Sequence, residues 1–229
     1  MSMPFYVSPE QVMNDKAQYA RKGVARGRSL CAIEYDEGIL LAAENPSEVL
    51  HKISEIYDKI AFAGVGKYSE FDALRRAGVQ FADVRGYQYS REDVDARSLA
   101  NAYAQMMAHT FTNDIKPLEV EILVVEVGPT QGEDRLFRIT FDGVVLDEDH
   151  FSVIGGEAEP IAERLKQSWQ PDLSLADALR TARAALAGDD HSIEPGQLEV
   201  AVLTRTNGRR AFRRIEKDAL ETILAPAAS

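Results

Sequence analysis

The sequence predicts an α+β fold, a four-layer αββα sandwich of two stacked antiparallel sheets with an extra N-terminal helix. Segments with strand character occur in runs joined by tight turns, which is typical of antiparallel sheet. Helical segments occur in pairs between these runs, so that each pair can cover the outer face of one sheet. The strict alternation of strand and helix that a doubly wound fold needs does not occur in this sequence.

The first predicted element is a helix over residues 9–22. Ser8 is a favourable N-cap, Pro9 fits the first helical position, and Gln11 completes a capping box. Gly23 is the predicted end of this helix, because glycine commonly follows the last helical residue.

Two strand pairs are predicted next. Residues 29–35 and 39–43 flank the turn Asp36-Glu37-Gly38, and this arrangement predicts a hairpin. Residues 51–57 and 59–64 form the second predicted pair. Together these four segments make the first run of antiparallel strands.

A pair of helices follows these strands. The first is predicted to start near Ser69, with Asp72 three residues on, and the second near Ser90, with Asp93 in the same role. Apolar residues recur at three- and four-residue spacing in both segments, which predicts one buried face for each helix. These residues are Phe71, Leu74 and Phe81 in the first helix and Leu99, Ala102, Tyr103, Met106 and Met107 in the second.

The strands then resume with a segment over residues 118–125. Its first half alternates apolar residues with Glu119 and Glu121, whereas its second half is apolar on both faces. The pattern predicts a strand that passes from a half-exposed to a fully buried position. A hairpin over residues 136–146 turns at Asp142-Gly143, and a strand over residues 151–154 ends at two glycines.

The C-terminal part repeats the scheme. Helices are predicted over residues 157–168 and 174–187, the second capped by Ser174 with Asp177 and ended by Gly188. A last hairpin joins residues 198–204 to residues 210–215 through Asn207-Gly208, and a short helix with Leu220, Ile223 and Leu224 closes the chain.

The composition sets the broad class of the protein. The chain has 229 residues, of which 45% are hydrophobic and 28% charged, as is ordinary for a globular protein with a sizeable core. No linker rich in Pro, Gly or Ser divides it, so we predict one domain over residues 9–229 behind a tail over residues 1–8. The net charge of −11 argues against a nucleic-acid binder.

The sequence also bears on the compartment. No apolar run approaches the roughly 20 residues of a membrane span, and the first residues lack the pattern of a signal peptide. The one cysteine, Cys31, excludes an internal disulfide framework and fits a reducing cytoplasm. We therefore expect a cytoplasmic protein without membrane partners.

The sequence contains no clear active-site motif. The four histidines, His51, His109, His150 and His191, lack metal-ligand spacing, so we expect no metal and no cofactor. The segment Gly64-Val65-Gly66-Lys67 lacks two defining positions of a phosphate loop and is interpreted as a strand-to-helix turn. Cys31 lies in an apolar strand, where a free thiol is usually inert.

One basic segment has three interpretations. Residues 205–217 contain five arginines and Lys217 at the last position. A solvated hairpin is the favoured interpretation, and contact with an acidic neighbouring subunit is the second. Nucleic acid ranks third, because Phe212 alone could stack on a base.

Several ordered matches resemble the proteasome subunit family. They are Gly27 to Ile33 and Asp36 to Glu44 as the opening hairpin, His51 to Tyr57 as the lysine-centred strand, Ala63 to Gly66 as the turn into a long helix, the block 139–156, and Leu198 to Leu203 as the late core strand. The segments Tyr6 to Gln11 and Ala20 to Gly23 are similar to the actinobacterial α type of this family. The resemblance covers nearly the whole chain and implies the N-terminal-nucleophile hydrolase fold.

The resemblance also implies the loss of catalysis. β-type subunits expose a threonine as N-terminal nucleophile after self-cleavage, and the matching position after Gly27 is Arg28. A guanidinium has no nucleophilic oxygen, and loss of a nucleophile can cost about a million-fold in rate. Glu44 and Lys52 are the counterparts of supporting active-site residues. The chain is thus expected to be a non-enzymatic part of a threonine-type endopeptidase complex, with a catalytic β-type-like hydrolase as the alternative.

The resemblance further implies partners. In the family, helices such as residues 9–22 pack between neighbours in a seven-membered α ring that stacks on a ring of β subunits. The tail before the helix gates the pore, and here its gate residues would be Met3, Pro4, Phe5, Tyr6 and Val7.

A docking site for an activator is implied as well. The lysine that corresponds to Lys52 lines a pocket between α subunits and receives the C-terminal carboxylate of a ring-shaped AAA ATPase or another activator. A desolvated ammonium–carboxylate hydrogen bond contributes about 1.5–3 kcal/mol, and several tails on one ring add effective concentration. Gly64 is expected to border the same pocket.

Overall fold

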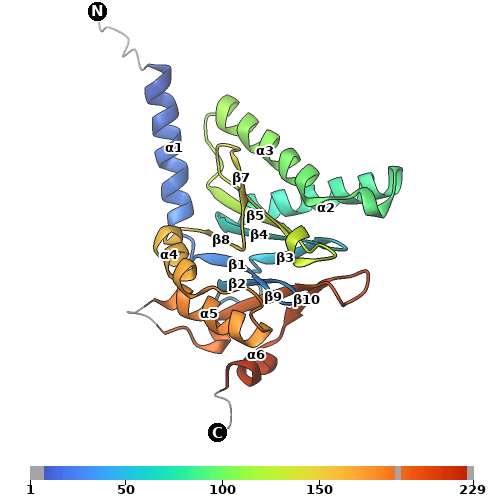
Figure 1. The fold of residues 1–229 in the computed structure, drawn as a ribbon. Coiled ribbons are helices and arrows are strands. Elements are labelled where there is room, and N and C mark those ends of the chain that lie inside the picture. Colours follow the sequence, from blue (N-terminus) through green and yellow to red (C-terminus); the bar gives the residue numbers. More distant parts are fainter. Residues whose placement is uncertain (1–7, 189–191, 226–229) are drawn as a thin grey trace, which may run out of the picture.

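Two five-stranded antiparallel sheets form the centre of the molecule (Figure 1). The structure is a computed structural model and describes residues 8–188 and 192–225. The first sheet has the order β10-β9-β2-β1-β8, and the second has the order β3-β4-β5-β6-β7. The strands are β1 Leu30–Tyr35, β2 Gly38–Glu44, β3 Ile53–Tyr57, β4 Ile60–Gly66, β5 Val120–Glu126, β6 Arg135–Ile139, β7 Val145–Glu148, β8 Phe151–Ile154, β9 Leu198–Thr204 and β10 Phe212–Ile215.

Helix pairs cover the two outer faces, as the sequence predicts. The helices are α1 Pro9–Ala25, α2 Tyr68–Gln88, α3 Ala96–Asn113, α4 Ala158–Ser168, α5 Leu175–Ala187 and α6 Lys217–Leu224. The pair α2 and α3 packs on the second sheet, and α4 and α5, with α6, pack on the first (Figure 1). A third apolar layer lies between the sheets, so the four-layer αββα sandwich is confirmed.

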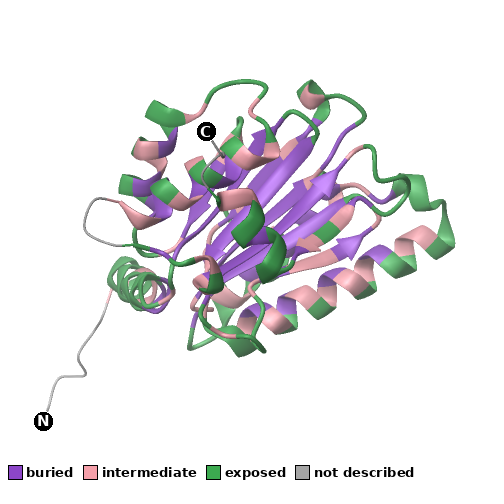
Figure 2. Cartoon of the chain, turned by 90° about the horizontal axis from the view of Figure 1, so that it is seen from below, coloured by how far each residue is buried: buried purple, intermediate pink, exposed green. Residues whose placement is uncertain are grey.

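The period of the strands explains this layering. Along β1, Cys31 and Ile33 face the helix side, whereas Leu30 and Ala32 face the other sheet. All four side chains are inaccessible to solvent, because a central strand in this fold is covered on both faces (Figure 2).

Helix α1 runs beyond its predicted end. Gly23 does not stop the helix but lies buried inside it, and α1 continues to Ala25 with Arg26 as C-cap. A Cβ at Gly23 would lie 2.5 Å from the Cβ of Glu119, so this glycine serves the close approach of α1 to the start of β5. The predicted N-cap is confirmed, since the Ser8 hydroxyl accepts a hydrogen bond from the Gln11 amide at 3.2 Å.

The start of α3 differs from the prediction. Ser90 caps only a short 3-10 turn, Arg91–Asp93, and the α-helix begins at Ala96. Asp95 is the true N-cap, because its carboxylate accepts hydrogen bonds from both the amide and the hydroxyl of Ser98 at 2.7 Å. A second capping residue five positions later therefore decides the boundary.

The acidic half of β5 is also more buried than predicted. Glu121 is 6% exposed, and its carboxylate accepts a hydrogen bond from Arg138 Nε on β6 at 2.7 Å. A cross-strand guanidinium makes this burial tolerable, because a buried carboxylate needs a charged partner.

Several other local predictions are confirmed. Ser174 caps α5 by accepting from the Asp177 amide at 3.2 Å, and Gly188 ends this helix with a positive φ of 64°. Gly66 has a φ of 110° at the turn from β4 into α2, so the glycine-rich segment is a strand-to-helix turn. Among the residues that the structure describes, no helix is both long and apolar enough to cross a membrane.

Candidate functional site

Arg28, Glu44 and Lys52 meet at one end of the sandwich. Arg28 precedes β1, Glu44 is the last residue of β2, and Lys52 precedes β3. Strands β1 and β2 pair in antiparallel register, which places the start of β1 beside the end of β2. The fold therefore brings together the three residues that the resemblance singles out.

Lys52 points into this cluster. Its Nζ donates to the carbonyl of Arg28 at 2.7 Å and to the carbonyl of Glu44 at 3.2 Å. Burial lowers the pKa of the Lys52 amine to about 8, while the charge of Glu199 acts to raise this pKa and that of Arg28 acts to lower it. An ammonium has three hydrogen-bond donors, and two of those of Lys52 are bonded to uncharged carbonyl oxygens.

Arg28 lies at the position that the resemblance assigns to a nucleophile. Its guanidinium is half exposed and forms an ion pair with the Glu44 carboxylate, which is 14% exposed. The neighbouring hydroxyl of Ser29 is buried and accepts a hydrogen bond from the Glu157 amide at 3.3 Å, at the start of α4. Ser29 thus caps a helix and is held away from solvent.

A small cavity of about 260 Å³ opens beside Arg28. Gly27, Ser29 and Glu44 line it together with Gly156, and the last residues of α1 form one wall. A Cβ at Gly27 would lie 2.6 Å from Val65, so the chain passes too close to β4 for a side chain here. Ser29 carries the only hydroxyl among the residues that line this cavity, and that hydroxyl is bonded to the Glu157 amide; none of the lining residues carries a thiol or an imidazole.

Gly64 on β4 is hydrogen-bonded to Lys52, the residue just before β3. Its amide donates to the Lys52 carbonyl at 3.0 Å, across the β3–β4 pair. A Cβ at Gly64 would lie 2.8 Å from the ring of Phe71, so α2 packs directly on this residue. Gly64 therefore supports the backbone of Lys52 at the entry to β3, and its predicted place at a docking pocket stays a prediction.

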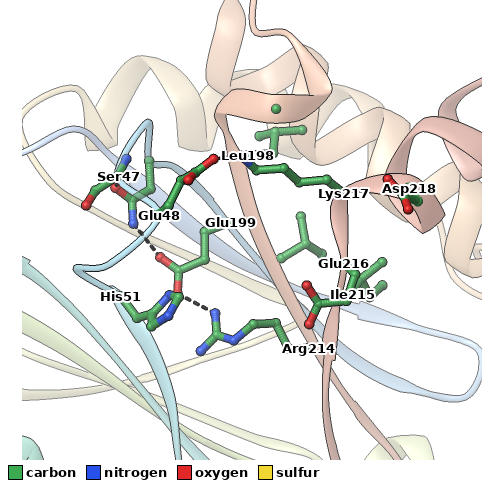
Figure 3. Close-up of a pocket in the computed structure, with 13 residues that line it drawn as sticks. Ser47, Glu48, His51, Leu198, Glu199, Arg214, Ile215, Glu216, Lys217 and Asp218 are labelled. Atoms are coloured by element: carbon green, nitrogen blue, oxygen red, sulfur yellow. Dashed lines mark hydrogen bonds and ion pairs between the residues drawn. The ribbon is translucent and has the colours of Figure 1, made fainter.

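A further residue, Glu199, belongs to the site, although no sequence motif assigns it there. It lies on β9, is 7% exposed, and accepts hydrogen bonds from the amides of Lys52 and Ile53 at 2.9 and 3.1 Å. Figure 3 shows its carboxylate between Arg214 on β10 and His51. The only signal in the sequence is a charged residue inside the otherwise apolar run Leu198 to Leu203.

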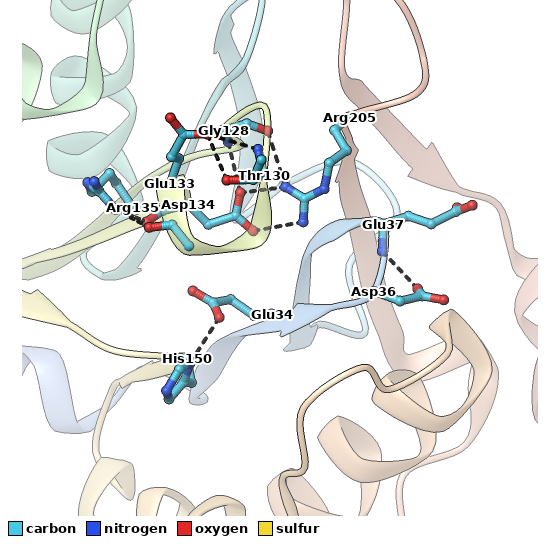
Figure 4. Close-up of polar contacts among 11 residues, drawn as sticks. Glu34, Asp36, Glu37, Gly128, Thr130, Glu133, Asp134, Arg135, His150 and Arg205 are labelled. Atoms are coloured by element: carbon cyan, nitrogen blue, oxygen red, sulfur yellow. Dashed lines mark hydrogen bonds and ion pairs between the residues drawn. The ribbon is translucent and has the colours of Figure 1, made fainter.

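The opposite end of the sandwich holds a second group of buried charges (Figure 4). Asp134, with a side chain that has no solvent exposure, binds Arg205 through two hydrogen bonds of 2.7 and 3.1 Å. Glu34 on β1 is hydrogen-bonded to His150 Nδ1 at 3.0 Å. Burial raises the pKa of the Glu34 carboxyl, and the His150 contact acts in the opposite direction.

The basic segment 205–217 is largely neutralised by carboxylates of the same chain. Arg205 pairs with Asp134, Arg210 with Glu55 at 2.6 Å, and Arg214 with Glu199 at 2.6 Å. Lys217 pairs with Glu48 at 2.6 Å. These pairs agree with the interpretation as part of a folded hairpin and leave the idea of an acidic neighbour without specific support.

The structure also bears on Cys31, on possible metal ligands and on the predicted gate residues. Cys31 is fully buried, and burial raises the pKa of its thiol to about 12, so it is not a nucleophile at neutral pH. Within residues 8–188 and 192–225, no group of three or more His, Cys, Asp or Glu side chains is arranged to hold a metal ion. The predicted gate residues Met3, Pro4, Phe5, Tyr6 and Val7 lie outside the described residues, as does His191.

Comparison with known proteins gives a consistent result. The sequence model of a family described as "Proteasome subunit" matches residues 24–203. The chain is 57% identical over 233 residues to the proteasome subunit alpha of Sanguibacter keddieii, with 100% of this chain and 91% of that protein covered. It is 55% identical to the proteins of the same name from Xylanimonas cellulosilytica, with 96% and 95% covered, and Acidimicrobium ferrooxidans, with 98% and 97% covered.

Proposed function

The chain belongs to the proteasome subunit family, in its α type, and on this premise we propose that it is the non-catalytic ring subunit of a bacterial core particle. In this role it forms the outer seven-membered rings, controls substrate entry and docks an activator, while the β subunits cleave peptide bonds. The observation that carries the proposal is the cluster of Arg28, Glu44 and Lys52, which keeps the shape of an active site without its nucleophile.

The attachment of α1 supports the loss of catalysis. A β-type nucleophile would require cleavage after Gly27 and would free α1 from the domain. Here α1 is tied to the body, because Lys16 Nζ donates to the Phe111 carbonyl at 3.0 Å and Gly23 packs on Glu119. Tyr19 also hydrogen-bonds the Glu119 carboxylate, which raises the pKa of the tyrosine hydroxyl. These contacts favour an intact N-terminal segment.

The outer surface of α1 supports ring formation. Helix α1 extends away from the two sheets, with its first turn farthest from them (Figure 1). Val12, Tyr19 and Ile115 line an apolar groove of about 580 Å³ between α1 and the segment before β5, and Ile115 is 98% exposed. Exposed apolar surface of this kind is typical of protein–protein contacts, and the ring neighbour is the proposed partner.

Lys52 supports activator docking. Its ammonium lies near the surface at one end of the sandwich, is partly desolvated, and is bound to carbonyl groups that add no negative charge. A carboxylate at a peptide C-terminus is the natural ligand for such a cation. We propose that the tail of a ring-shaped ATPase, or of another activator, supplies this carboxylate in the cytoplasm.

The proposed function is tested on the particle assembled from this chain and a β-type partner. We expect a large cylinder in sedimentation, and a stable monomer in the presence of that partner would contradict the ring role. Lys52→Met is expected to reduce the ratio of activator-stimulated to unstimulated degradation at least tenfold, the loss of about 1.4 kcal/mol per binding event. Deleting residues 1–7 is expected to speed peptide entry, and an unchanged rate would remove the gate from the proposal.

A catalytic hydrolase is the second candidate function. Mass spectrometry of the mature chain separates the two, since self-cleavage near Gly27 would remove α1 and yield a shortened chain. An intact chain that forms no covalent adduct with a proteasome-directed electrophile supports the structural role.

A further inference from the structure

The buried carboxylate of Glu199 collects donors from three different parts of the chain. One oxygen accepts from Asn45 Nδ2 at 2.7 Å and from the Lys52 amide at 2.9 Å. The other accepts from the Ile53 amide at 3.1 Å and from Arg214 at 2.6 Å. A carboxylate that accepts this many hydrogen bonds is held in one orientation, because every lone-pair direction is in use.

These bonds determine where β3 starts. Asn45 is the residue that follows β2, and its side-chain amide also donates a hydrogen bond to the Leu50 carbonyl at 2.7 Å. Glu199 therefore ties both ends of the loop over residues 46–51 to β9, and it sets the backbone of Lys52 through a direct bond to its amide. The direction of the Lys52 side chain towards Arg28 and Glu44 follows from this anchoring.

The same carboxylate acts on the charge of Lys52. Arg28, before β1, opposes the ammonium, and Glu44, at the end of β2, pairs with Arg28. Glu199 on β9 favours the ammonium, while the guanidinium of Arg214 on β10 partly offsets the charge of Glu199 (Figure 3). The Nδ1 atom of His51 lies 3.4 Å from the Glu199 carboxylate. Burial alone would drive Lys52 further towards its neutral form.

We propose that Glu199 is the positioning residue for activator docking: its buried carboxylate fixes the start of β3 and keeps the Lys52 side chain charged for the carboxylate of the docking tail. This inference rests on the docking role proposed for Lys52. Glu199 itself does not touch the ligand and acts only through Lys52.

A purely structural role predicts a different result from this proposal. If Glu199 only stabilised the loop, its loss would admit water around Lys52, and the pKa of the amine would rise towards the ordinary lysine value of 10.5. If Glu199 also supports the charge, its loss lowers the same pKa. The sign of the shift therefore separates the two roles.

The experiment measures acetylation of Lys52 by acetic anhydride between pH 6 and pH 10, by mass spectrometry of the assembled particle. The wild-type reactivity should have its midpoint near pH 8. Glu199→Gln is expected to lower the midpoint by on the order of one pH unit, the typical spread that neighbouring charges cause. Arg214→Gln should raise it, because an unneutralised Glu199 favours the ammonium more strongly.

Two further variants make the result specific. Glu199→Asp keeps the negative charge and should return the midpoint towards that of the wild type. Glu121→Gln is the matched control, since Glu121 is also buried and paired with an arginine but lies on β5 beside a different partner, Arg138. A midpoint that is unchanged or raised in Glu199→Gln overturns the proposal, and so does an equal shift in Glu121→Gln.

A second arm tests the docking role separately. A blocked trialanine peptide with a free C-terminal carboxylate, at millimolar concentration, should protect Lys52 from acetylation at pH 7, and the C-terminal amide of the same peptide should not. Absence of protection in the wild type overturns the docking function. A missing midpoint shift in Glu199→Gln, with protection intact, overturns only the role of Glu199.

Discussion

The two ends of the sandwich use similar charged groups in different ways. At one end, the planar guanidinium of Arg205 meets the Asp134 carboxylate in a two-bond arrangement, and the same carboxylate also accepts from the Gly128 amide at 2.8 Å. At the other end, the ammonium of Lys52 is bound to two carbonyls, and Glu199 supports its charge through space.

The difference teaches how a buried charge becomes a structural tie at one end and, in our proposal, a binding group at the other. The charges of Asp134 and Arg205 are paired with each other through hydrogen bonds, so neither side chain is left to bind an external ligand (Figure 4). Lys52 is partly desolvated and held over neutral acceptors, so an arriving carboxylate would strengthen its interactions.

The largest effect is expected at the Arg205 end. Arg205→Met leaves Asp134 charged and fully buried, which should lower the free energy of unfolding by about 3–5 kcal/mol. Urea denaturation of the purified chain measures this loss. Arg210→Met is the matched control, because Arg210 pairs with Glu55 on the exposed surface and its loss should be barely detectable. Equal losses in both variants would contradict the structural tie.

A smaller, pH-dependent effect is expected at the Lys52 end. Because the folded-state pKa of Lys52 is about 8 and its unfolded value is 10.5, the unfolded chain binds more protons between these values. The wild type should therefore gain stability relative to Lys52→Met as the pH rises from 7 to 9.5, by on the order of 1–3 kcal/mol. Urea denaturation of both proteins at several pH values gives the difference, and a flat difference would show that Lys52 is not desolvated.

The smallest effect is expected at Glu34. Its folded-state pKa is raised, so its contribution to stability is fully present below its ordinary pKa and is lost as the pH rises through the folded value. Between pH 4.5 and pH 7, the free energy of unfolding of the wild type should fall relative to that of Glu34→Gln. The fall should be smaller than the change at Lys52, because the His150 contact opposes the rise in the Glu34 pKa that burial causes. The same denaturation series measures it, and the opposite slope would mean that the His150 contact outweighs burial.

Local signals in the sequence predict most of the secondary structure. The caps at Ser8 and Ser174 and the stop at Gly188 all act within one turn of a helix, so they can be recognised from adjacent residues. The predictions at Gly23 and Ser90 fail because a distant contact or a second cap decides the boundary. A glycine that leaves room for a neighbouring side chain, as Gly23 does for Glu119, cannot be distinguished in the sequence from a glycine that ends a helix.

The candidate site is only half visible in the sequence. Arg28, Glu44 and Lys52 were identified by resemblance, and the structure brings them together. Local sequence patterns do not reveal Glu199, because its partners Lys52 and Ile53 are more than 140 residues away along the chain. They do not reveal the pair of Asp134 and Arg205 either, because 71 residues separate these two side chains.

The sequence by itself determined the order of strands and helices and the burial of the second half of β5 on both faces, which follow from residue type and from spacing within a few positions. The presence of an arginine where a hydrolase would need a nucleophile follows from the resemblance to the proteasome family. The tertiary structure alone decided that Lys52 lies over the carbonyls of Arg28 and Glu44, and that Glu199 anchors it. The physical reason is that burial and the electrostatic environment of a charge depend on groups that only folding brings within a few ångströms of one another.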